Sequence, residues 1–362
     1  MHHSTNHRDG SLHMNVDRLT PKVTIGLPVH NGERYVAEAI QSILAQTYDN
    51  IELIISDNAS TDRTEEICRR YAAQDPRVRY YRQAVNLGAA PNFNRVFESS
   101  GASRYFKWAA HDDWIAPNYL EECVGTLEAD PAAVLCQSLI ENVNADGQRL
   151  GTYDHTAAGN GSARPSDRFW ARLKNPRCME VFGVIRSDAL AATGMIASYA
   201  GGDRSLLLEL ALRGRFLLVR QHLFFHRIHG ETYSLRVCGR QTPHEELAWY
   251  SPQASRWNTL NTWMLYGHCL RIIHNRVESR AEQLRCYGYL VRTLGSWRRC
   301  VILLIEPLLA MDARLFRGYI KLKQIKRKAF GTKVQPTLNA SGSSTAEIRP
   351  RLFRNSYSQR SN

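Results

Sequence analysis

The chain has 362 residues, of which 43% are hydrophobic and 22% charged, and this composition excludes a wholly disordered or collagen-like protein. The net charge of +13 is unevenly spread: Ser251 to Asn362 contains 20 Lys and Arg residues against 5 Asp and Glu residues, whereas the preceding residues contain 27 against 29. The basic C-terminal third therefore predicts a polyanionic partner, either a nucleic acid or an anionic membrane surface.

The N-terminal 21 residues lack the apolar run of a secretory signal, and we expect them to form a flexible leader. The cysteines occur singly, without the spacing of a zinc site, which favours a reduced, cytoplasmic chain. The longest apolar run, Cys300 to Met311, is shorter than the roughly 18 residues that a membrane span needs, and it contains Glu306 and Pro307. We therefore expect a protein that does not cross a membrane.

Strands and helices alternate from residue 22 to about residue 140, which predicts an α/β fold with a mostly parallel, doubly wound sheet flanked by helices. The pattern predicts strands at 22–27, 51–56, 78–82, 105–109 and 134–139, and helices at 33–46, 64–73, 91–99 and 117–129. Polar loops follow the C-terminal ends of several strands. Ligands bind at this edge of such sheets, so the loops are candidate site segments.

Residues 141–250 extend the same domain, with strands expected at 181–186 and 216–219, a helix at 205–213 and a loop at 151–165. From about residue 251 to residue 330 the apolar residues recur at helical spacing among basic ones, which predicts an amphipathic helical extension. Residues 331–362 are rich in Ser, Asn and Arg, and we expect a disordered tail there.

Two polar segments follow the first two predicted strands. The first, Pro28-Val29-His30-Asn31-Gly32-Glu33, suits a turn that wraps a nucleotide base, or an ordinary turn in which Asn31 caps the next helix. The second contains Asp57, which is placed to accept hydrogen bonds from a base or ribose. In the same segment Asp62 is equally consistent with a ligand contact and with capping of the helix that follows.

Two further segments carry groups suited to a diphosphate. Asn86 and Gly88 are followed by Asn94, and their amides, together with a backbone that a glycine leaves open, are suited to holding phosphates. Asp112 and Asp113 end an apolar strand, where adjacent carboxylates repel each other unless a cation such as Mn²⁺ or Mg²⁺ is bound. A solvated turn before the next helix is the alternative for this pair.

In this order the four segments resemble the family 2 glycosyltransferases, which have the GT-A fold. The resemblance covers roughly residues 22–230 and rests on Pro28 with Asn31, Asp57 with Ser60 and Asp62, Asn86 with Gly88, and Asp112 with Asp113. It implies that Pro28, His30 and Asp57 contact the base, that Asp112 contacts the ribose or sugar, and that Asp113 binds the metal. His30 departs from the family, in which an aromatic Tyr is more common at this position.

The resemblance extends to two later segments. Gly201-Gly202-Asp203-Arg204 opens an apolar helix, as does the family segment that carries the catalytic base, so Asp203 is implied to be the base. Gly202 stands where the family commonly has Glu, and without the resemblance Asp203 is as good a helix cap. Arg227 and His229 are similar to the family's R-x-H element, which implies a diphosphate contact and a further metal ligand. A surface strand with alternating polar residues is the alternative.

Together these residues predict a metal-dependent glycosyltransferase that moves one sugar, with inversion, from a UDP-, GDP- or dTDP-linked donor to a lipid-linked or cell-surface glycan acceptor. The implied donor-binding residues are Pro28, His30, Asn31, Glu33, Asp57, Asp62, Asn86, Gly88, Asn94, Asp112 and Arg227. The basic extension predicts a peripheral location on the cytoplasmic face of a membrane. The alternatives are a catalytically impaired nucleotide-sugar-binding protein and a nucleic-acid-binding protein that uses the basic third.

Overall fold

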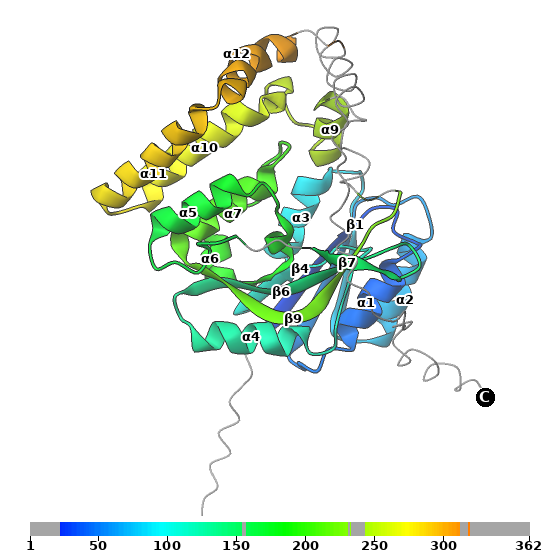
Figure 1. Ribbon diagram of the computed structural model, residues 1–362. Coiled ribbons are helices and arrows are strands. Elements are labelled where there is room, and N and C mark those ends of the chain that lie inside the picture. The colour runs from blue at the N-terminus through cyan, green and yellow to red at the C-terminus, as the bar shows by residue number, and fades with distance from the viewer. Residues whose placement is uncertain (1–21, 154–156, 231, 233–242, 312–317, 319–362) are drawn as a thin grey trace, which may run out of the picture.

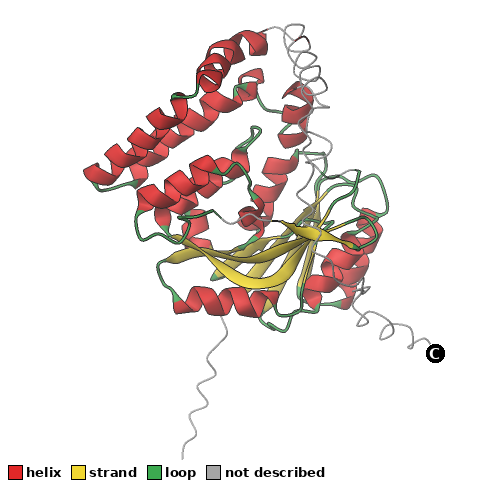
Figure 2. Ribbon diagram, viewed as in Figure 1, coloured by secondary structure: helices red, strands yellow, loops and turns green. Residues whose placement is uncertain are grey.

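A computed structural model describes residues 22–153, 157–230, 232, 243–311 and 318 (Figure 1). The predicted leader, the predicted tail and residues 312–330 apart from 318 lie outside the described residues. Within the described part, the chain forms one curled sheet with helices on both of its faces (Figure 2). The structure therefore confirms the predicted α/β class.

The N-terminal half alternates strands and helices in the predicted order. Its strands are β1 (Val23–Val29), β2 (Ile51–Asp57), β3 (Val78–Arg82) and β4 (Tyr105–Trp108). Its helices are α1 (Val36–Leu44), α2 (Thr64–Gln74), α3 (Ala89–Glu98) and α4 (Tyr119–Ala129). β1 pairs in parallel with both β2 and β4, and β2 pairs in parallel with β3. All four strands therefore present their C-terminal ends at one edge of the sheet.

The second half of the sheet is mixed. Its strands are β5 (Trp114–Ile115), β6 (Ala133–Val143), β7 (Arg149–Tyr153), β8 (Val184–Arg186) and β9 (Arg215–Arg227), and the sheet order is β3-β2-β1-β4-β8-β6-β9-β5, with β7 on β6. β8 is antiparallel to β4 and β6, whereas β9 runs parallel to β6. Two predictions were wrong in detail: residues 179–182 form the 3-10 turn η1, and residues 151–153 belong to β7.

Two hydrophobic cores hold the helices to the sheet. One core joins the sheet to α1, α2 and α4, and the other joins its opposite face to α3 and α7 (Gly202–Arg213). The remaining helices of this half are α5 (Pro165–Lys174) and α6 (Ser187–Ala191). β2 is buried along almost its whole length because helices cover both faces, which explains its uninterrupted apolar sequence.

The C-terminal region adds a further layer of helices. It comprises α9 (Pro243–Tyr250), the 3-10 turn η2 (Arg256–Thr259), α10 (Asn261–Arg276), α11 (Arg280–Leu294) and α12 (Trp297–Met311). α10 and α11 share a third hydrophobic core with α5 and α7, and α12 lies at the outer edge of the molecule (Figure 1). Within the described residues, no helix combines the length and the apolar character that crossing a bilayer requires.

Candidate active site

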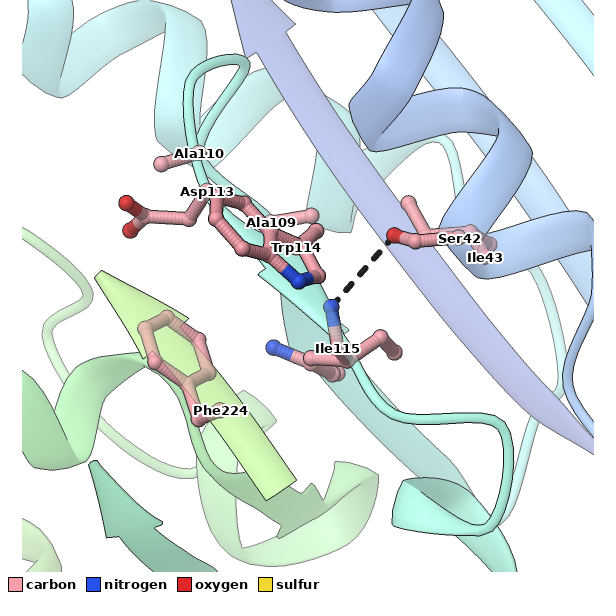
Figure 3. A pocket seen from close by; sticks show the side chains of 9 residues that line it. Ser42, Ile43, Ala109, Ala110, Asp113, Trp114, Ile115 and Phe224 are labelled. Carbon is pink, nitrogen blue, oxygen red and sulfur yellow. Dashed lines mark hydrogen bonds between the residues drawn. The ribbon is translucent and has the colours of Figure 1, made fainter. Parts of the chain in front are cut away.

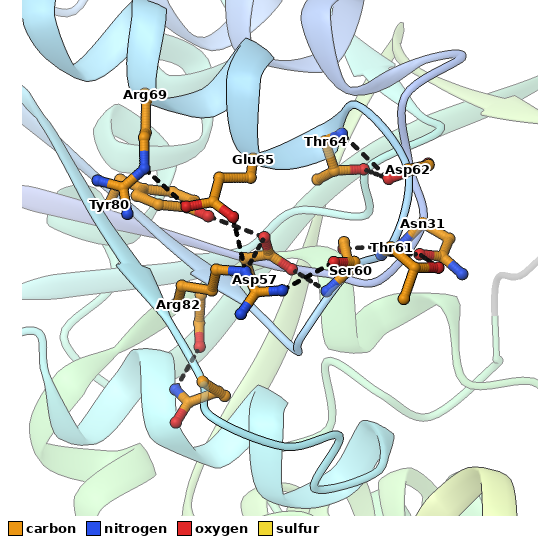
Figure 4. Close-up of polar contacts among 12 residues, drawn as sticks. Asn31, Asp57, Ser60, Thr61, Asp62, Thr64, Glu65, Arg69, Tyr80 and Arg82 are labelled. Atoms are coloured by element: carbon orange, nitrogen blue, oxygen red, sulfur yellow. Dashed lines mark hydrogen bonds and ion pairs between the residues drawn. The ribbon is translucent and has the colours of Figure 1, made fainter.

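The loops that follow β1 and β2 are joined to each other at the C-terminal edge of the sheet. Val29 and Asp57, the last residues of the two strands, are partners in the sheet register. Beyond them, the backbone N–H of Thr61 donates to Asn31 Oδ1 at 2.9 Å, and the N–H of Asn31 donates to Ser60 Oγ at 2.9 Å (Figure 4). Asn31 also has a φ of 52°, which asparagine tolerates better than most residues. The two predicted base-binding loops thus form one unit.

Asp57 is the internal brace of this unit. Its side chain is 0% exposed, Oδ1 accepts from the Ser60 N–H at 2.8 Å, and Oδ2 accepts from the Tyr80 hydroxyl at 2.8 Å. Arg82 Nε lies 3.9 Å from the same carboxylate. A buried carboxylate needs such partners, because an unpaired buried charge is strongly destabilising. The structure therefore places Asp57 beneath the loop, where its direct partners are groups of the chain itself.

Glu33 and Asp62 join the two loops by reciprocal hydrogen bonds. The Glu33 N–H donates to Asp62 Oδ2 and the Arg63 N–H donates to Glu33 Oε2, each at 3.0 Å. Asp62 Oδ1 accepts from the Thr64 N–H at 3.0 Å, at the start of α2. Burial acts to raise the pKa of Asp62, but the hydrogen bonds from Thr64 and Glu33 outweigh it and the pKa is lowered. This geometry matches the capping alternative for Asp62.

The segment 86–88 is held against the same unit. Asn86 Oδ1 accepts from the Gly88 N–H at 2.8 Å and from Asn58 Nδ2 at 2.9 Å, while Asn86 Nδ2 lies 3.2 Å from His30 Nε2. Asn58 Oδ1 in turn accepts from the Leu87 N–H at 2.8 Å. Asn58 is buried and links two of the predicted donor segments, and the sequence analysis did not single it out. Its position one residue after Asp57 was the available signal.

Gly88 is required by a close approach of the chain to itself. Its φ is +87°, and a Cβ at this position would lie 2.6 Å from the carbonyl oxygen of Tyr250 and 2.7 Å from Ser251 Cα. Pro252 is equally close, with Cδ at 2.7 Å. The sequence analysis expected a ligand to approach this glycine. In the structure the neighbour is the segment 250–252, which leads from α9 into the C-terminal helices.

Asp112 and Asp113 lie between β4 and β5 and have different surroundings. Asp113 is almost fully buried, and its Oδ1 accepts from the Arg227 N–H at 2.9 Å and lies 3.1 Å from His226 Nδ1. Asp112 is more open, with 15% of its side chain exposed, and its Oδ2 lies 2.9 Å from His229 Nε2. The structure thus brings both carboxylates together with the predicted R-x-H element at the end of β9.

The charge state of Asp112 follows from this setting. Burial acts to raise the pKa of its carboxyl, but His111, the hydrogen bond from His229, and His226 together lower it to about 2. For His226 the balance runs the other way: burial acts to lower its pKa, and the charge of Asp113 raises it. These histidines therefore favour an ionised Asp112 carboxylate at neutral pH.

Arg227 positions this cluster. Its Nε donates to the carbonyl of Asp112 at 3.0 Å, one terminal nitrogen donates to the carbonyl of Ala145 at 2.8 Å, and the other donates to Glu38 on α1. The guanidinium carbon also lies 4.4 Å from the centre of the Tyr35 ring and 4.6 Å from that of Trp114. Because these partners occupy the guanidinium, Arg227 acts on the site by holding Asp112 and its loop.

The side chains around Asp112 provide only part of the ligand set that a hard divalent cation needs. Among the described residues no group of three or more His, Cys, Asp and Glu side chains is arranged to hold a metal ion. Asp112 and His229 nevertheless form a carboxylate and imidazole pair at the edge of the site, whereas Asp113 is committed to β9. Mg²⁺ typically takes one or two carboxylates and completes its shell with substrate phosphates. The pair supplies one carboxylate and one imidazole of the ligands that such a cation would need.

A buried lysine lines the same small pocket as Asp113. Lys107 Nζ donates to the carbonyls of Phe182 at 2.7 Å and Trp108 at 3.0 Å, and it lies 5.1 Å from the ring centres of Tyr119 and Phe224. Burial lowers the pKa of this amine to about 7. Lys107 lines a small pocket together with residues of α1, β5 and β9 (Figure 3). The sequence analysis missed it, although a lysine within the apolar run YFKWA was the available signal.

Asp203 occupies the first turn of α7. Its Oδ1 accepts from the Arg204 N–H at 2.8 Å, and burial of the carboxyl raises its pKa. The preceding residue must be glycine for a steric reason: a Cβ on Gly202 would lie 2.0 Å from the carbonyl oxygen of Ala197. The loop before α7 thus occupies the space that a side chain at position 202 would need. With this backbone, the Glu that the family commonly has at this position would clash with Ala197.

The loop before α7 is hydrogen-bonded to α3 on one side and to α9 and η2 on the other. Asn94 Nδ2 donates to the carbonyl of Ile196 at 2.9 Å, and the Ile196 N–H donates back to Asn94 Oδ1 at 3.1 Å. Asn258 Nδ2 donates to the carbonyl of Ser198 at 3.0 Å, and the Gly201 N–H lies 3.5 Å from the Tyr250 hydroxyl. Asn94, which was expected to hold a diphosphate, has the loop before α7 as its partner in the structure.

Comparison with known proteins bears on this arrangement. Residues 24–194 match the model of the family described as glycosyl transferase family 2. This stretch is a family 2 glycosyl transferase domain. The match begins in β1 and ends beyond α6, so the family 2 domain contains the linked loops and both aspartates. Asp203 and the R-x-H element lie C-terminal to it.

The relatives of the family 2 domain match it over part of their length. An uncharacterized glycosyltransferase of Rickettsia typhi is 39% identical over 114 residues, which is 32% of this chain and 34% of that protein. The glycosyltransferase GlyG of Streptococcus pneumoniae is 31% identical over 129 residues, which is 36% of this chain and 42% of that protein. The chain thus spans well under half the length of these relatives.

One solved structure has a similar fold over most of this chain. S. aureus TarS, residues 1–349 in complex with UDP-GlcNAc, superposes with a TM-score of 0.50 at 15% identity, over 85% of this chain and 92% of that one. At this identity the likeness establishes the fold alone. The GT-A fold predicted from the sequence is therefore confirmed.

Proposed function

We propose that this chain is a glycosyltransferase that moves sugar from a UDP-, GDP- or dTDP-linked donor to an acceptor hydroxyl with inversion. The observation that carries the proposal is the meeting of the predicted donor segments at one edge of the sheet. The loops after β1, β2 and β3 are joined by side chains such as Asn31 and Asn58, and Asp112 faces His229 at the end of β9. Carboxyl edges of such sheets bind nucleotides.

In this proposal the base lies against the unit formed by residues 28–33 and 57–62, with the exposed His30 at its surface. Pro28, which was expected to contact the base, is instead buried within β1. Asp112 faces the ribose or the sugar. Mn²⁺ or Mg²⁺ is held by Asp112 and His229, a choice supported by the greater exposure of the Asp112 side chain, 15% against 4% for Asp113, which the sequence predicted as the ligand. Binding by Asp112 and His229 exchanges their mutual hydrogen bond for bonds to the cation. A divalent cation neutralises charge on the departing nucleoside diphosphate.

Asp203 is proposed as the general base. It accepts the proton of the acceptor hydroxyl while the hydroxyl oxygen bonds to the anomeric carbon and the bond from that carbon to the diphosphate oxygen breaks. Attack opposite to the leaving group inverts the configuration. The raised pKa of Asp203 supports this role, because a general base is most effective when its pKa is closer to the working pH.

The acceptor is proposed to be a lipid-linked or cell-surface glycan at the cytoplasmic face of a membrane. Its support is the basic C-terminal third, whose helices share a core with α5 and α7. The segment Gln253-Ala254-Ser255-Arg256-Trp257 matches the Gln-x-x-Arg-Trp motif of processive synthases, so the expected transfer of a single sugar has no support from the sequence.

The test is a screen of nucleotide sugars with the full chain, in the presence and absence of Mn²⁺ or Mg²⁺, in which release of nucleoside diphosphate is measured. We expect one donor class to be consumed, and the Asp203→Asn variant to bind that donor without consuming it. Binding without turnover by the unaltered chain, across all donors and acceptors offered, would support the catalytically impaired alternative. The absence of any donor binding would reject the proposal.

A further inference from the structure

The outward face of α12 is apolar along its whole length. Trp297 is 71% exposed, Leu304 74%, Leu308 57% and Met311 68%, and Val301 between them is 40% exposed. The spacing of these five residues is 4, 3, 4 and 3, which places them on one side of an α-helix. We call this row the α12 stripe. A contiguous exposed apolar surface of this kind marks an interaction site in most proteins.

The opposite side of α12 is fixed to the protein, so the stripe does not face outward by accident of a loose helix. The Glu306 carboxylate accepts from the Thr262 N–H at 3.0 Å and from the Trp263 N–H at 3.3 Å, at the start of α10. Trp263 Nε1 donates to the carbonyl of Leu303 at 2.9 Å. α12 therefore packs on α10 through one side and presents the stripe on the other.

The charges around the stripe are positive. In the sequence of α12, Glu306 is the one acidic residue, and its carboxylate is bound to the backbone of α10. Arg285 and Arg292 are exposed on α11, which contacts α12. Arg285 forms an ion pair with Glu282, and the Arg292 guanidinium lies over the ring of Trp170. Over residues 251–311, the part of this region that the structure describes, the sequence contains 8 Arg residues against 3 Glu residues. The partner of this surface must therefore be both apolar and anionic.

Three occupants can be compared on this basis. A second copy of the chain would bring two strongly basic surfaces together, and like charges across an interface are repulsive. A nucleic acid would neutralise the charge but would leave the large apolar side chains of the stripe without a partner. An anionic bilayer offers an apolar layer at the depth of the side chains and a negative surface around it. Charge complementarity together with the stripe therefore selects the bilayer.

We propose that α12 is a membrane-docking helix that lies in the interfacial plane of an anionic bilayer, with Trp297, Leu304 and Leu308 inserted among the lipid chains. The helix reaches the lipid without spanning it. The inference rests on α12 and not on the donor site, so its failure and the failure of the proposed function are separable. If both hold, docking brings the site to an acceptor that is carried on lipid.

The test is co-sedimentation of the full chain with vesicles of phosphatidylcholine alone and of phosphatidylcholine mixed with phosphatidylglycerol. We expect binding to the mixed vesicles that weakens with added salt, and little binding to phosphatidylcholine alone. The double variant Leu304→Glu/Leu308→Glu should lose at least about tenfold in affinity, because it removes inserted apolar area and adds charges that the anionic surface repels. Both positions are exposed, so the variant should retain the unfolding transition of the unaltered chain.

The matched control is Leu150→Glu on β7, where an exposed leucine lies on the sheet and not on α12. It should bind the mixed vesicles as the unaltered chain does. Unchanged binding of the double variant, or equal loss in the control, would overturn the assignment of the stripe. A stable dimer in sedimentation velocity that the double variant abolishes would overturn the choice of a bilayer in favour of a second copy.

Discussion

Replacement of Gly88 by alanine tests whether the C-terminal region is seated on the donor loop. Gly88 has a φ of +87° and a ψ of 170°, a backbone conformation essentially restricted to glycine, so any other residue meets a penalty of about 1–3 kcal/mol. The new Cβ also meets the Tyr250 carbonyl oxygen at 2.6 Å and Ser251 Cα at 2.7 Å, which are backbone atoms that cannot rotate away. Overpacking of this kind costs about 1–3 kcal/mol more. We therefore expect a loss of about 2–6 kcal/mol in the free energy of unfolding.

The control for this prediction is Gly101→Ala. Gly101 also has a positive φ, +61°, but a Cβ there has no atom within 4 Å, so the variant should lose only the backbone penalty of about 1–2 kcal/mol. Urea unfolding of both variants, followed by tryptophan fluorescence, measures the difference, which we expect to be about 1–3 kcal/mol. Equal losses in the two variants would refute the contact between segment 250–252 and the donor loop.

Two further predictions concern titrating groups. Asp203→Asn should lower transfer activity by about 100- to 10,000-fold. The folded-state pKa of Asp203 is raised above 3.8, so the stability that this carboxyl contributes at low pH is lost as the pH rises. The variant should therefore unfold at neutral pH no more readily than the unaltered chain. Full activity would remove Asp203 from the mechanism. Lys107 is protonated in the unfolded chain up to pH 10.5 but in the folded chain only up to about 7, so stability should rise with pH across this window, and Lys107→Met should abolish that component of the slope in unfolding experiments. An identical slope in the variant would contradict the buried position of Lys107.

The order of the elements in the N-terminal half followed from local pattern. The strand at Val78–Arg82 was predicted with its observed bounds, and β2 differed by one residue, because buried parallel strands carry apolar runs that can be read without knowledge of their neighbours. The short strand β5 has two residues and no periodicity to detect, and it exists because β9 pairs with it. Local pattern does not contain that information.

The residues of the candidate site could likewise be predicted from local sequence only in part. The sequence identified Asp112, Asp113, Arg227 and His229, and the structure places them together although more than 110 positions separate Arg227 from Asp113. The sequence predicted a base or ribose contact for Asp57, and a ligand contact or a helix cap for Asp62. It did not show that both side chains hold the loops together, because this role depends on partners such as Tyr80 and Glu33 in other segments. Contacts between distant segments therefore decide which polar residues are open to a ligand.

Calorimetric titration of UDP, GDP and dTDP, each with Mn²⁺, into the full chain tests the central claim most directly. The claim is that the joined loops and Asp112 form one nucleotide site. We predict saturable binding of at least one of the three, binding weakened by Asp112→Asn, and unchanged binding in Asp203→Asn, whose side chain acts on the acceptor. Binding of none of the three, or equal affinity in the Asp112→Asn variant, would contradict the account.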